Sequence, residues 1–386
     1  MVPGVIGAEI DIDNVYIYLC DALRWSSLSD SMKSRGASFK TIASGCATMK
    51  AVSSIVSGVY PPNHGVHTWR DRTTRDTLFD LPEISIGFHN PAAGEHGGLN
   101  RVLGQQDEDT LPDIDPPFFF FERDQGGHAP YRDYTYEEMI TELTHDRPEL
   151  RTYYEEAIEE SIDRFDRRLE ILSDRDLLAD TLIIFLGDHG ELLGEYGLVS
   201  HSSPIVPEMV YVPTVFVHPE LPRGVQSETI GHVDIVPTVL SALGTTQSKA
   251  EFDGVDLFSE QPGFRYTEAS HFQRFRNRRI PVFQAAGIWD GDGGHVFNQR
   301  GKLFSPIIGY LKAQGWNRAY WKANLREIPT ALSRYSKPHI IYGAPEASKT
   351  TASNAVRRIQ RSEPSAERIE IDETVEDRLE ELGYRT

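Results

Sequence analysis

The chain has 386 residues, 39% of them hydrophobic and 25% charged, which suits one large α/β domain with an appendage or two domains. It carries 39 Lys and Arg against 58 Asp and Glu, so its formal net charge is -19 and its surface should repel nucleic acid phosphates. The same excess of acid indicates adaptation to concentrated salt, because counterions screen the self-repulsion.

Signals for membranes and export do not appear in the sequence. No stretch approaches about 18 consecutive apolar residues, so we expect no membrane span. The N-terminus, MVPGVIGAEIDIDN, lacks the basic and long apolar regions of a secretory signal. Two cysteines, Cys20 and Cys46, do not suggest a disulfide framework. These features predict a cytoplasmic protein, and they carry no information on its oligomeric state.

Three apolar runs each end in an aspartate: VYIYLCD at Asp21, FFFFERD at Asp124 and LIIFLGD at Asp188. Such runs are typical of strands that are buried on both faces. Ligands of open α/β sheets bind beyond the carboxyl ends of these strands, and His128 and His189 closely follow the last two runs. Divalent cations prefer such carboxylates and imidazoles, so the pattern predicts a metal-dependent hydrolase.

A short helix is predicted between the first two of these runs. Its apolar positions follow helical spacing and predict a start at Thr48 and an end at Gly58. A hydroxyl at a helix N-terminus lies where the dipole and free N–H groups favour an anion. Thr48 is therefore either an N-cap or a nucleophile. Lys50 is either a surface lysine or a group that binds an anionic substrate oxygen.

Further elements follow in chain order up to residue 245. Apolar residues at three- and four-residue spacing predict a helix from Glu149 to Leu172. Strands are expected over residues 181–187 and 212–217, and His232 opens another helix, which ends at Gly244. The alternation of strands and helices predicts a largely parallel sheet covered by helices.

Beyond Thr245 the periodicity weakens, and an acidic tail helix is expected near Val375. We therefore expect a catalytic domain over residues 1–245 and a C-terminal subdomain with a tail over residues 246–386.

The order of these motifs resembles the alkaline phosphatase superfamily over roughly residues 14–245. The segment GDHGELLGEYG, which starts at Gly187, is similar to the second signature of sulfatases, and HVDIVPT at His232 and FDGVDL at Phe252 are similar to segments that follow it. The resemblance implies an α/β/α sandwich of the alkaline phosphatase type, with a largely parallel central sheet and a smaller C-terminal subdomain. Two branches compete, the sulfatases and the nucleotide pyrophosphatase/phosphodiesterase-like enzymes.

The expected nucleophile separates the two branches. In sulfatases, a Cys or Ser that matures to formylglycine lies ten residues before the Gly of a Thr-Gly-x-Tyr turn, and counting back from Gly58 gives Thr48 rather than Cys46. The formylglycine pattern Cys-x-Pro/Ala-x-Arg also differs from Cys46-Ala-Thr-Met-Lys50. Threonine matches the phosphodiesterase-like branch and cannot form the aldehyde hydrate on which sulfatase turnover depends. The resemblance therefore favours phosphoryl over sulfuryl chemistry.

The resemblance also implies metal ligands. One cation would be held by Asp21, Thr48, Asp188 and His189, and a second by Asp124, His128 and a third histidine, with His201 preferred over His232. Two cations, zinc or alternatively manganese, could clamp the attacking and leaving oxygens. In the rival interpretation, His128-Ala-Pro-Tyr131 is the sulfatase element that contacts substrate, and the site holds a single calcium or magnesium ion.

Together these expectations describe an ester hydrolase. It would cleave a phosphate mono- or diester, carried on a small molecule or a glycan, through a covalent intermediate on Thr48. One alternative is a sulfatase that uses Thr48 or a formylglycine derived from Cys46. Another is a transferase that places phosphate groups on surface polymers.

Overall fold

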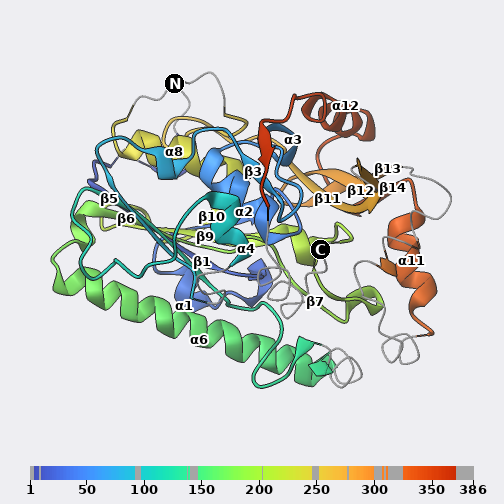
Figure 1. The fold of residues 1–386 in the computed structure, drawn as a ribbon, viewed down its shortest axis with the longest axis horizontal. Helices are drawn as coiled ribbons and strands as arrows, with labels where there is room; N and C mark the ends of the chain where they lie inside the picture. Colours follow the sequence, from blue (N-terminus) through green and yellow to red (C-terminus); the bar gives the residue numbers. More distant parts are fainter. Residues whose placement is uncertain are drawn as a thin grey trace.

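A computed structural model of the chain describes residues 4–7, 10–91, 97–136, 138–139, 147–201, 203–245, 252–275, 278–299, 307, 310–311 and 325–370. A central sheet has helices on both faces, and a smaller antiparallel sheet lies to one side (Figure 1). The predicted α/β class is therefore confirmed. The acidic helix expected near Val375 lies outside the described residues.

The central sheet has seven strands in the order β10-β2-β9-β6-β1-β5-β4. All neighbouring pairs are parallel except those of β9, which runs antiparallel to β2 and β6. This confirms the prediction of a largely parallel sheet. The strands span β1 (Asn14–Cys20), β2 (Ala37–Ile42), β4 (Ser85–His89), β5 (Phe118–Asp124), β6 (Thr181–Leu186), β9 (Tyr211–Val217) and β10 (Gly224–Gly231).

Two apolar cores lie on opposite faces of this sheet. One packs beneath α2 (Thr48–Ser57), α4 (Gly98–Leu103) and α8 (Ile235–Ala242), and the other against α1 (Asp30–Lys33) and the long α6 (Arg147–Asp174). Figure 1 shows α6 along the lower face and α2 and α8 above the sheet. The predicted stripe of α6 is confirmed, since its buried side chains include Leu150, Tyr154, Ile158, Phe165 and Leu172.

Strand alternation decides which core each side chain enters. On β1, Val15, Ile17 and Leu19 pack under α2, while Tyr18 and Cys20 pack against α6. The Cys20 thiol is therefore buried on the face of the sheet opposite to the Asp21 side chain.

The second sheet, in the order β11-β12-β13-β14, is antiparallel and has no counterpart among the elements predicted from sequence. Its strands are β11 (Arg265–Phe275), β12 (Arg278–Trp289), β13 (Gly293–Gln299) and β14 (His339–Gly343), with α11 (Ile328–Ser336) and α12 (Lys349–Ile359) beside them. The Glu268 N–H donates to the Ser44 carbonyl at 3.2 Å, and Glu268 accepts from the Cys46 N–H at 3.2 Å. The second sheet is therefore attached directly to the loop that precedes Thr48. The predicted boundary at residue 245 stays a prediction.

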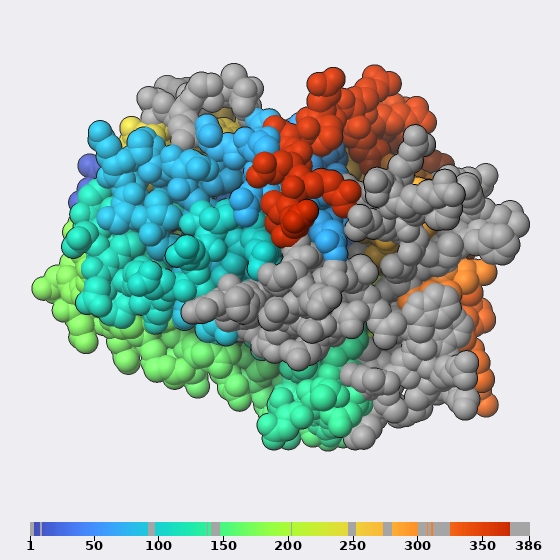
Figure 2. All heavy atoms as spheres, in the orientation of Figure 1, coloured from blue at the N-terminus to red at the C-terminus, as the bar shows by residue number. Residues whose placement is uncertain are grey.

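Short elements complete the described chain. In Figure 2 the red C-terminal residues lie against the blue N-terminal part, where β15 pairs with β3. No helix among the described residues combines the length and the apolar character needed to cross a membrane. The short elements are η1 (Trp25–Ser27), α3 (Pro61–His64), β3 (Asp71–Thr73), η2 (Leu78–Asp80), η4 (Leu178–Asp180), β7 (Leu192–Leu193), η5 (Glu195–Gly197), β8 (Val199–Ser200), α7 (Pro207–Val210), η6 (His232–Asp234) and β15 (Ala366–Arg368).

Candidate active site

Three predicted ligands meet at the carboxyl ends of β1 and β6. Because these strands are parallel neighbours, Asp21 and the Asp188–His189 pair leave the sheet at the same edge. All three side chains are buried, and one ligand atom from each lies within 4.8 Å of the others. His189 Nε2 is 3.6 Å from Asp21 Oδ1 and 3.5 Å from Asp188 Oδ2.

Thr48 lies against this cluster. Its Oγ1 is 3.2 Å from His189 Nε2 and donates to Asp21 Oδ2 at 3.4 Å. The predicted helix from Thr48 to Gly58 is confirmed, with Gly58 in the left-handed conformation that ends it. The N-cap is Ala47, however, so Thr48 is the first helical residue and the N-cap interpretation is wrong. Its hydroxyl is directed to the cluster.

The cluster suits a cation because two of its buried oxygens lack a hydrogen bond. Within the described part of the chain, Asp21 Oδ1 and Asp188 Oδ2 accept none, and His189 Nε2 is beyond hydrogen-bond distance of both. Burying an unpaired carboxylate oxygen costs free energy, and two carboxylates with an imidazole are a donor set typical of zinc or manganese. Burial and the charge of Asp21 raise the pKa of Asp188 above its usual range. A positive charge between the two carboxylates would relieve this repulsion.

Arg123 is a site residue that the sequence analysis missed. Its Nε donates to Asp21 Oδ2 at 2.8 Å, its Nη2 donates to the same oxygen, and its Nη1 donates to Asn90 Oδ1 at 3.1 Å. Although burial opposes ionisation of Asp21, Arg123 and the nearby histidines hold its pKa below the usual range. Strand alternation along β5 is the signal that could have identified Arg123.

The same alternation turns Asp124 away from the cluster. Its side chain lies on the α6 face, where Arg164 Nε donates to Oδ2 at 2.6 Å and Arg164 Nη2 donates to Oδ1 at 2.9 Å. The Gly126 N–H also donates to Oδ1, at 2.8 Å. The structure therefore does not bring Asp124 to the predicted metal ligands. The prediction for Asp124 rested on its position at the end of a strand, which does not specify the face of the sheet on which the side chain lies.

His128 and His201 do join the site. The His201 ring centroid is 4.5 Å from that of His189 and 4.7 Å from that of His128, so three buried imidazoles line up beside the carboxylates. Burial lowers the pKa of His128 to about 4 and that of His201 well below its usual value. Both rings are therefore neutral at pH 7 and available for proton exchange or metal binding.

Glu191 lies beside these rings and is buried. Its Oε2 is 3.4 Å from His201 Nδ1. Burial raises the pKa of Glu191 to about 7. A carboxyl poised between its two protonation states thus borders the histidine row.

His232, the alternative third ligand, has a different role. Its Nδ1 accepts from the Ser44 N–H at 3.3 Å, and its Nε2 donates to the Gly187 carbonyl at 3.0 Å. Both ring nitrogens are therefore used in joining two loops of the site. His201 lies at the cluster, whereas His232 braces the backbone around it.

Lys50 and Cys46 lie on either side of Thr48 in the sequence but outside the carboxylate cluster. Lys50 is buried, donates to Ser270 Oγ at 2.6 Å and lies 3.6 Å from Glu268, so the surface interpretation is wrong. Cys46 packs in an apolar cluster beneath the second sheet, and burial raises the pKa of its thiol to about 12. A formylglycine at Cys46 would place a polar aldehyde hydrate in that apolar core.

Comparison with known sequences places these residues in a family context. The family model for sulfatases matches residues 57–245. The low-salt glycan biosynthesis sulfotransferase Agl7 of Haloferax volcanii is 32% identical over 420 residues, and the match covers all of both chains. A choline-sulfatase of Rhizobium meliloti is 29% identical over 119 residues, which are 30% of this chain and 22% of that protein.

Solved structures show the same fold. A 2-O GAG sulfatase superposes with a TM-score of 0.59 at 14% identity, over 84% of this chain and 92% of its own. The phosphonate monoester hydrolase of Agrobacterium radiobacter also gives a TM-score of 0.59 at 14% identity, over 88% of this chain and 99% of its own. The architecture therefore occurs in enzymes of both sulfur and phosphorus esters.

Proposed function

Because the chain belongs to the sulfatase family of the alkaline phosphatase superfamily, we propose that it transfers a sulfuryl or phosphoryl group through a covalent ester on Thr48. The observation that carries this proposal is the position of Thr48 Oγ1, 3.2 Å from His189 Nε2 and 3.4 Å from Asp21 Oδ2, at a helix N-terminus. A hydroxyl oxygen beside two buried carboxylates and a histidine suits nucleophilic attack on an anionic ester.

Members of this superfamily depend on metals, and we assign one cation to Asp21, Asp188, His189 and Thr48. When bound, zinc or manganese would supply positive charge to the carboxylates and to the anionic group of the substrate. A second cation has weaker support, because Arg164 already occupies both oxygens of Asp124. His128 and His201 then serve better as contacts to the substrate.

The side chains around Thr48 suggest a sequence of two displacements. Asp21 Oδ2 accepts a hydrogen bond from the Thr48 hydroxyl, and Arg123 fixes that carboxylate in place. When Thr48 Oγ attacks, the S–O or P–O bond to Thr48 forms and the bond to the donor oxygen breaks; the Thr48 proton passes to Asp21, and water protonates the donor oxygen. An acceptor hydroxyl then attacks the Thr48 ester, its proton passes through neutral His128 or His201 to solvent, and Asp21 returns its proton to the Thr48 oxygen as the ester bond breaks.

A threonine nucleophile favours transfer between two alcohols over release to water. Sulfatases expel sulfate through an aldehyde hydrate, which Thr48 cannot form. The sulfate ester on Thr48 would therefore persist until an acceptor such as a sugar hydroxyl, rather than water, attacks it. Agl7 is named a sulfotransferase of glycan biosynthesis, and the match spans both full chains. We therefore assign sulfuryl transfer to a glycan as the first function. The net charge of -19 also supports work in concentrated salt.

Phosphate ester hydrolysis is the second candidate. Unmodified Thr48 is a competent nucleophile for phosphorus, and the Agrobacterium enzyme shows that the fold accommodates such esters. In this case water takes the place of the sugar hydroxyl in the second displacement.

One assay separates the candidates. The purified chain, supplied with zinc or manganese in concentrated salt, is incubated with p-nitrophenyl sulfate, p-nitrophenyl phosphate or bis-p-nitrophenyl phosphate, with and without a methyl hexoside as acceptor. Sulfuryl transfer predicts p-nitrophenol release from the sulfate that increases with the hexoside and yields a sulfated sugar. Release from the phosphates without any effect of the hexoside would establish the second candidate. No release from any ester would exclude both.

A further inference from the structure

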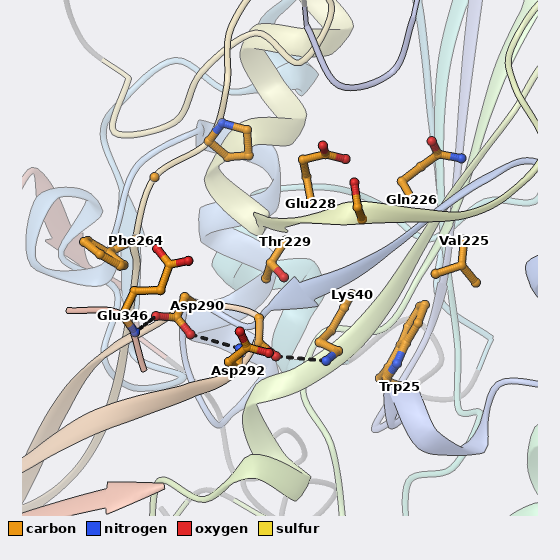
Figure 3. Close-up of a pocket in the computed structure, with 14 residues that line it drawn as sticks. Trp25, Lys40, Val225, Gln226, Glu228, Thr229, Phe264, Asp290, Asp292 and Glu346 are labelled. Carbon is orange, nitrogen blue, oxygen red and sulfur yellow. Dashed lines mark hydrogen bonds between the residues drawn. The ribbon is translucent and has the colours of Figure 1, made fainter. Parts of the chain in front are cut away.

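A hollow with a volume of about 590 Å³ opens at the free edge of the central sheet, where the second sheet meets it. It lies between β10, the middle of β2 and the turn that joins β12 to β13 (Figure 3). None of the cluster residues Asp21, Thr48, Asp188 and His189 lines it. The size is that of pockets that hold small organic ligands.

Aromatic side chains mark the two ends of the hollow. Figure 3 shows Phe264 at one end and Trp25 at the other, with Lys40 and Thr229 between them. Phe264 is 39% exposed, and Val225, which also lines the wall, is 58% exposed. These side chains offer apolar contact area to a ligand within an otherwise polar hollow.

The polar lining is acidic, and part of it is unpaired. Four carboxylates surround the hollow, but Asp290 already accepts from the N–H groups of Asp292 at 2.9 Å and Glu346 at 2.8 Å. Lys40 is the one lysine or arginine in the lining, and it donates to the Gly291 carbonyl at 2.9 Å. Within the described part of the chain, no hydrogen bond or ion pair engages the carboxylates of Glu228 and Asp292. They can therefore accept hydrogen bonds from a ligand.

We propose that this hollow binds an uncharged sugar ring. The C–H face of a hexose packs on an aromatic surface such as Trp25 or Phe264, and its hydroxyls donate to the free carboxylates of Glu228 and Asp292. The lining holds four carboxylates and one ammonium group, and a second ammonium group, Lys33 Nζ, lies 5.0 Å from the Trp25 ring centroid. The remaining excess of negative charge disfavours a ring that carries sulfate, phosphate or carboxylate. This assignment does not depend on the chemistry at Thr48.

The test measures sugar binding to the full-length Thr48→Ala protein, so that turnover at Thr48 does not interfere. Methyl α-glucoside, methyl α-mannoside and methyl β-galactoside are titrated by calorimetry and by saturation-transfer NMR, with glucuronic acid as the anionic comparison. We expect at least one neutral glycoside to bind, and Trp25→Ala to weaken that binding about tenfold, the effect of removing one aromatic contact. Glucuronic acid should bind more weakly than the neutral sugar, and Glu228→Gln should narrow this difference.

Ile341→Ala is the matched control, because Ile341 is exposed on β14 and lies outside the hollow. It should leave the binding of the neutral sugar unchanged, and circular dichroism should show that Trp25→Ala keeps its fold. Failure of all three neutral glycosides to bind would overturn the proposal. Equal binding of the neutral sugar to the parent and to both Trp25→Ala and Glu228→Gln would also overturn it.

Discussion

Two buried charged clusters flank the start of α2, and they differ in how well their charges are matched. Around Glu268, Oε1 lies 3.1 Å from His67 Nδ1 and 3.6 Å from Lys50 Nζ, and Oε2 accepts from the Tyr266 hydroxyl at 3.0 Å. Around Asp188 the charges are less well matched. Asp188 Oδ2 and the adjacent Asp21 Oδ1 accept no hydrogen bond within the described residues, and both carboxylates share His189, whose Nε2 lies 3.5 and 3.6 Å from these oxygens.

A buried carboxylate with matched partners stabilises the fold, whereas a buried carboxylate beside a second one destabilises it until a ligand supplies positive charge. Although burial opposes its ionisation, the partners of Glu268 lower its pKa to about 2, so ionised Glu268 stabilises the folded state. Burial and a second carboxylate raise the pKa of Asp188, so ionised Asp188 destabilises the folded state. We propose a bound cation as the partner of the second cluster. The first cluster already has Lys50 and His67 beside its carboxylate.

The largest expected effect is on activity, and it distinguishes Thr48 from Cys46, two residues earlier in the chain. Thr48→Ala should reduce turnover on the order of 10³-fold or more, because it removes the attacking oxygen. Cys46→Ala should keep most of the activity, because the thiol packs in an apolar cluster. Initial rates of ester cleavage by the two variants measure this, and the reverse ranking would place the chemistry at Cys46.

At the matched cluster, Glu268→Gln should destabilise the protein at neutral pH by on the order of 3 kcal/mol, since it breaks a buried ion pair. Urea unfolding of both proteins measures the difference. Because the folded state lowers the pKa of this group, its contribution is complete above about pH 4.3, the unfolded value, and is lost as the pH falls toward 2.

The difference in free energy of unfolding between the parent and Glu268→Gln should therefore stay constant from pH 7 to about pH 5 and decrease below that. A gap that grew on acidification would mean that Glu268 is not held ionised by its partners.

At the cluster of Asp21 and Asp188, Asp188→Asn should stabilise the metal-free protein, whereas Glu268→Gln destabilises it. Replacing the carboxylate removes repulsion from Asp21 and should raise the free energy of unfolding by on the order of 1 kcal/mol. Zinc or manganese at about 100 times its Kd should stabilise the parent by about 2.7 kcal/mol and the variant much less. Thermal unfolding with and without the metal checks both effects, and a destabilised metal-free variant would contradict the comparison.

A smaller effect, on metal affinity, is expected at Arg123, which holds Asp21 in place and is not itself a proposed metal ligand. Arg123→Lys keeps the positive charge but loses the two-pronged contact with Asp21 Oδ2. Metal affinity, measured by calorimetry, should fall about tenfold, as it does when other supporting partners of metal ligands are replaced. An unchanged affinity would show that Asp21 is positioned without Arg123.

Much of the fold could be predicted because its signals are local. Apolar runs marked β1, β5 and β6, and helical spacing marked α6, whose span of Arg147–Asp174 encloses the predicted Glu149 to Leu172. The second sheet could not be predicted, because β11 is rich in polar residues, β12 begins with two Arg, β13 begins with two Gly, and β13 pairs with the distant β14. No local periodicity reports such pairing.

The site residues also divide into those that local sequence signals predict and those that depend on distant parts of the chain. Asp21, Thr48, Asp188 and His189 were predicted together because each lies at an element end that the sequence marks, and the structure brings them within reach of one another. Asp124 was predicted as a ligand and Arg123 was missed, because a strand end alone does not specify the face of the sheet on which a side chain lies. Lys50 and Glu191 could not be placed without knowing that β11 and neighbouring loops bury them.

Peptide mass spectrometry of the enzyme, quenched during a single turnover, tests whether Thr48 is the nucleophile. We predict a sulfuryl or phosphoryl group on Thr48 in the peptide that spans residues 41–50, with Cys46 unmodified. The group on any other residue, or formylglycine at position 46, would contradict it.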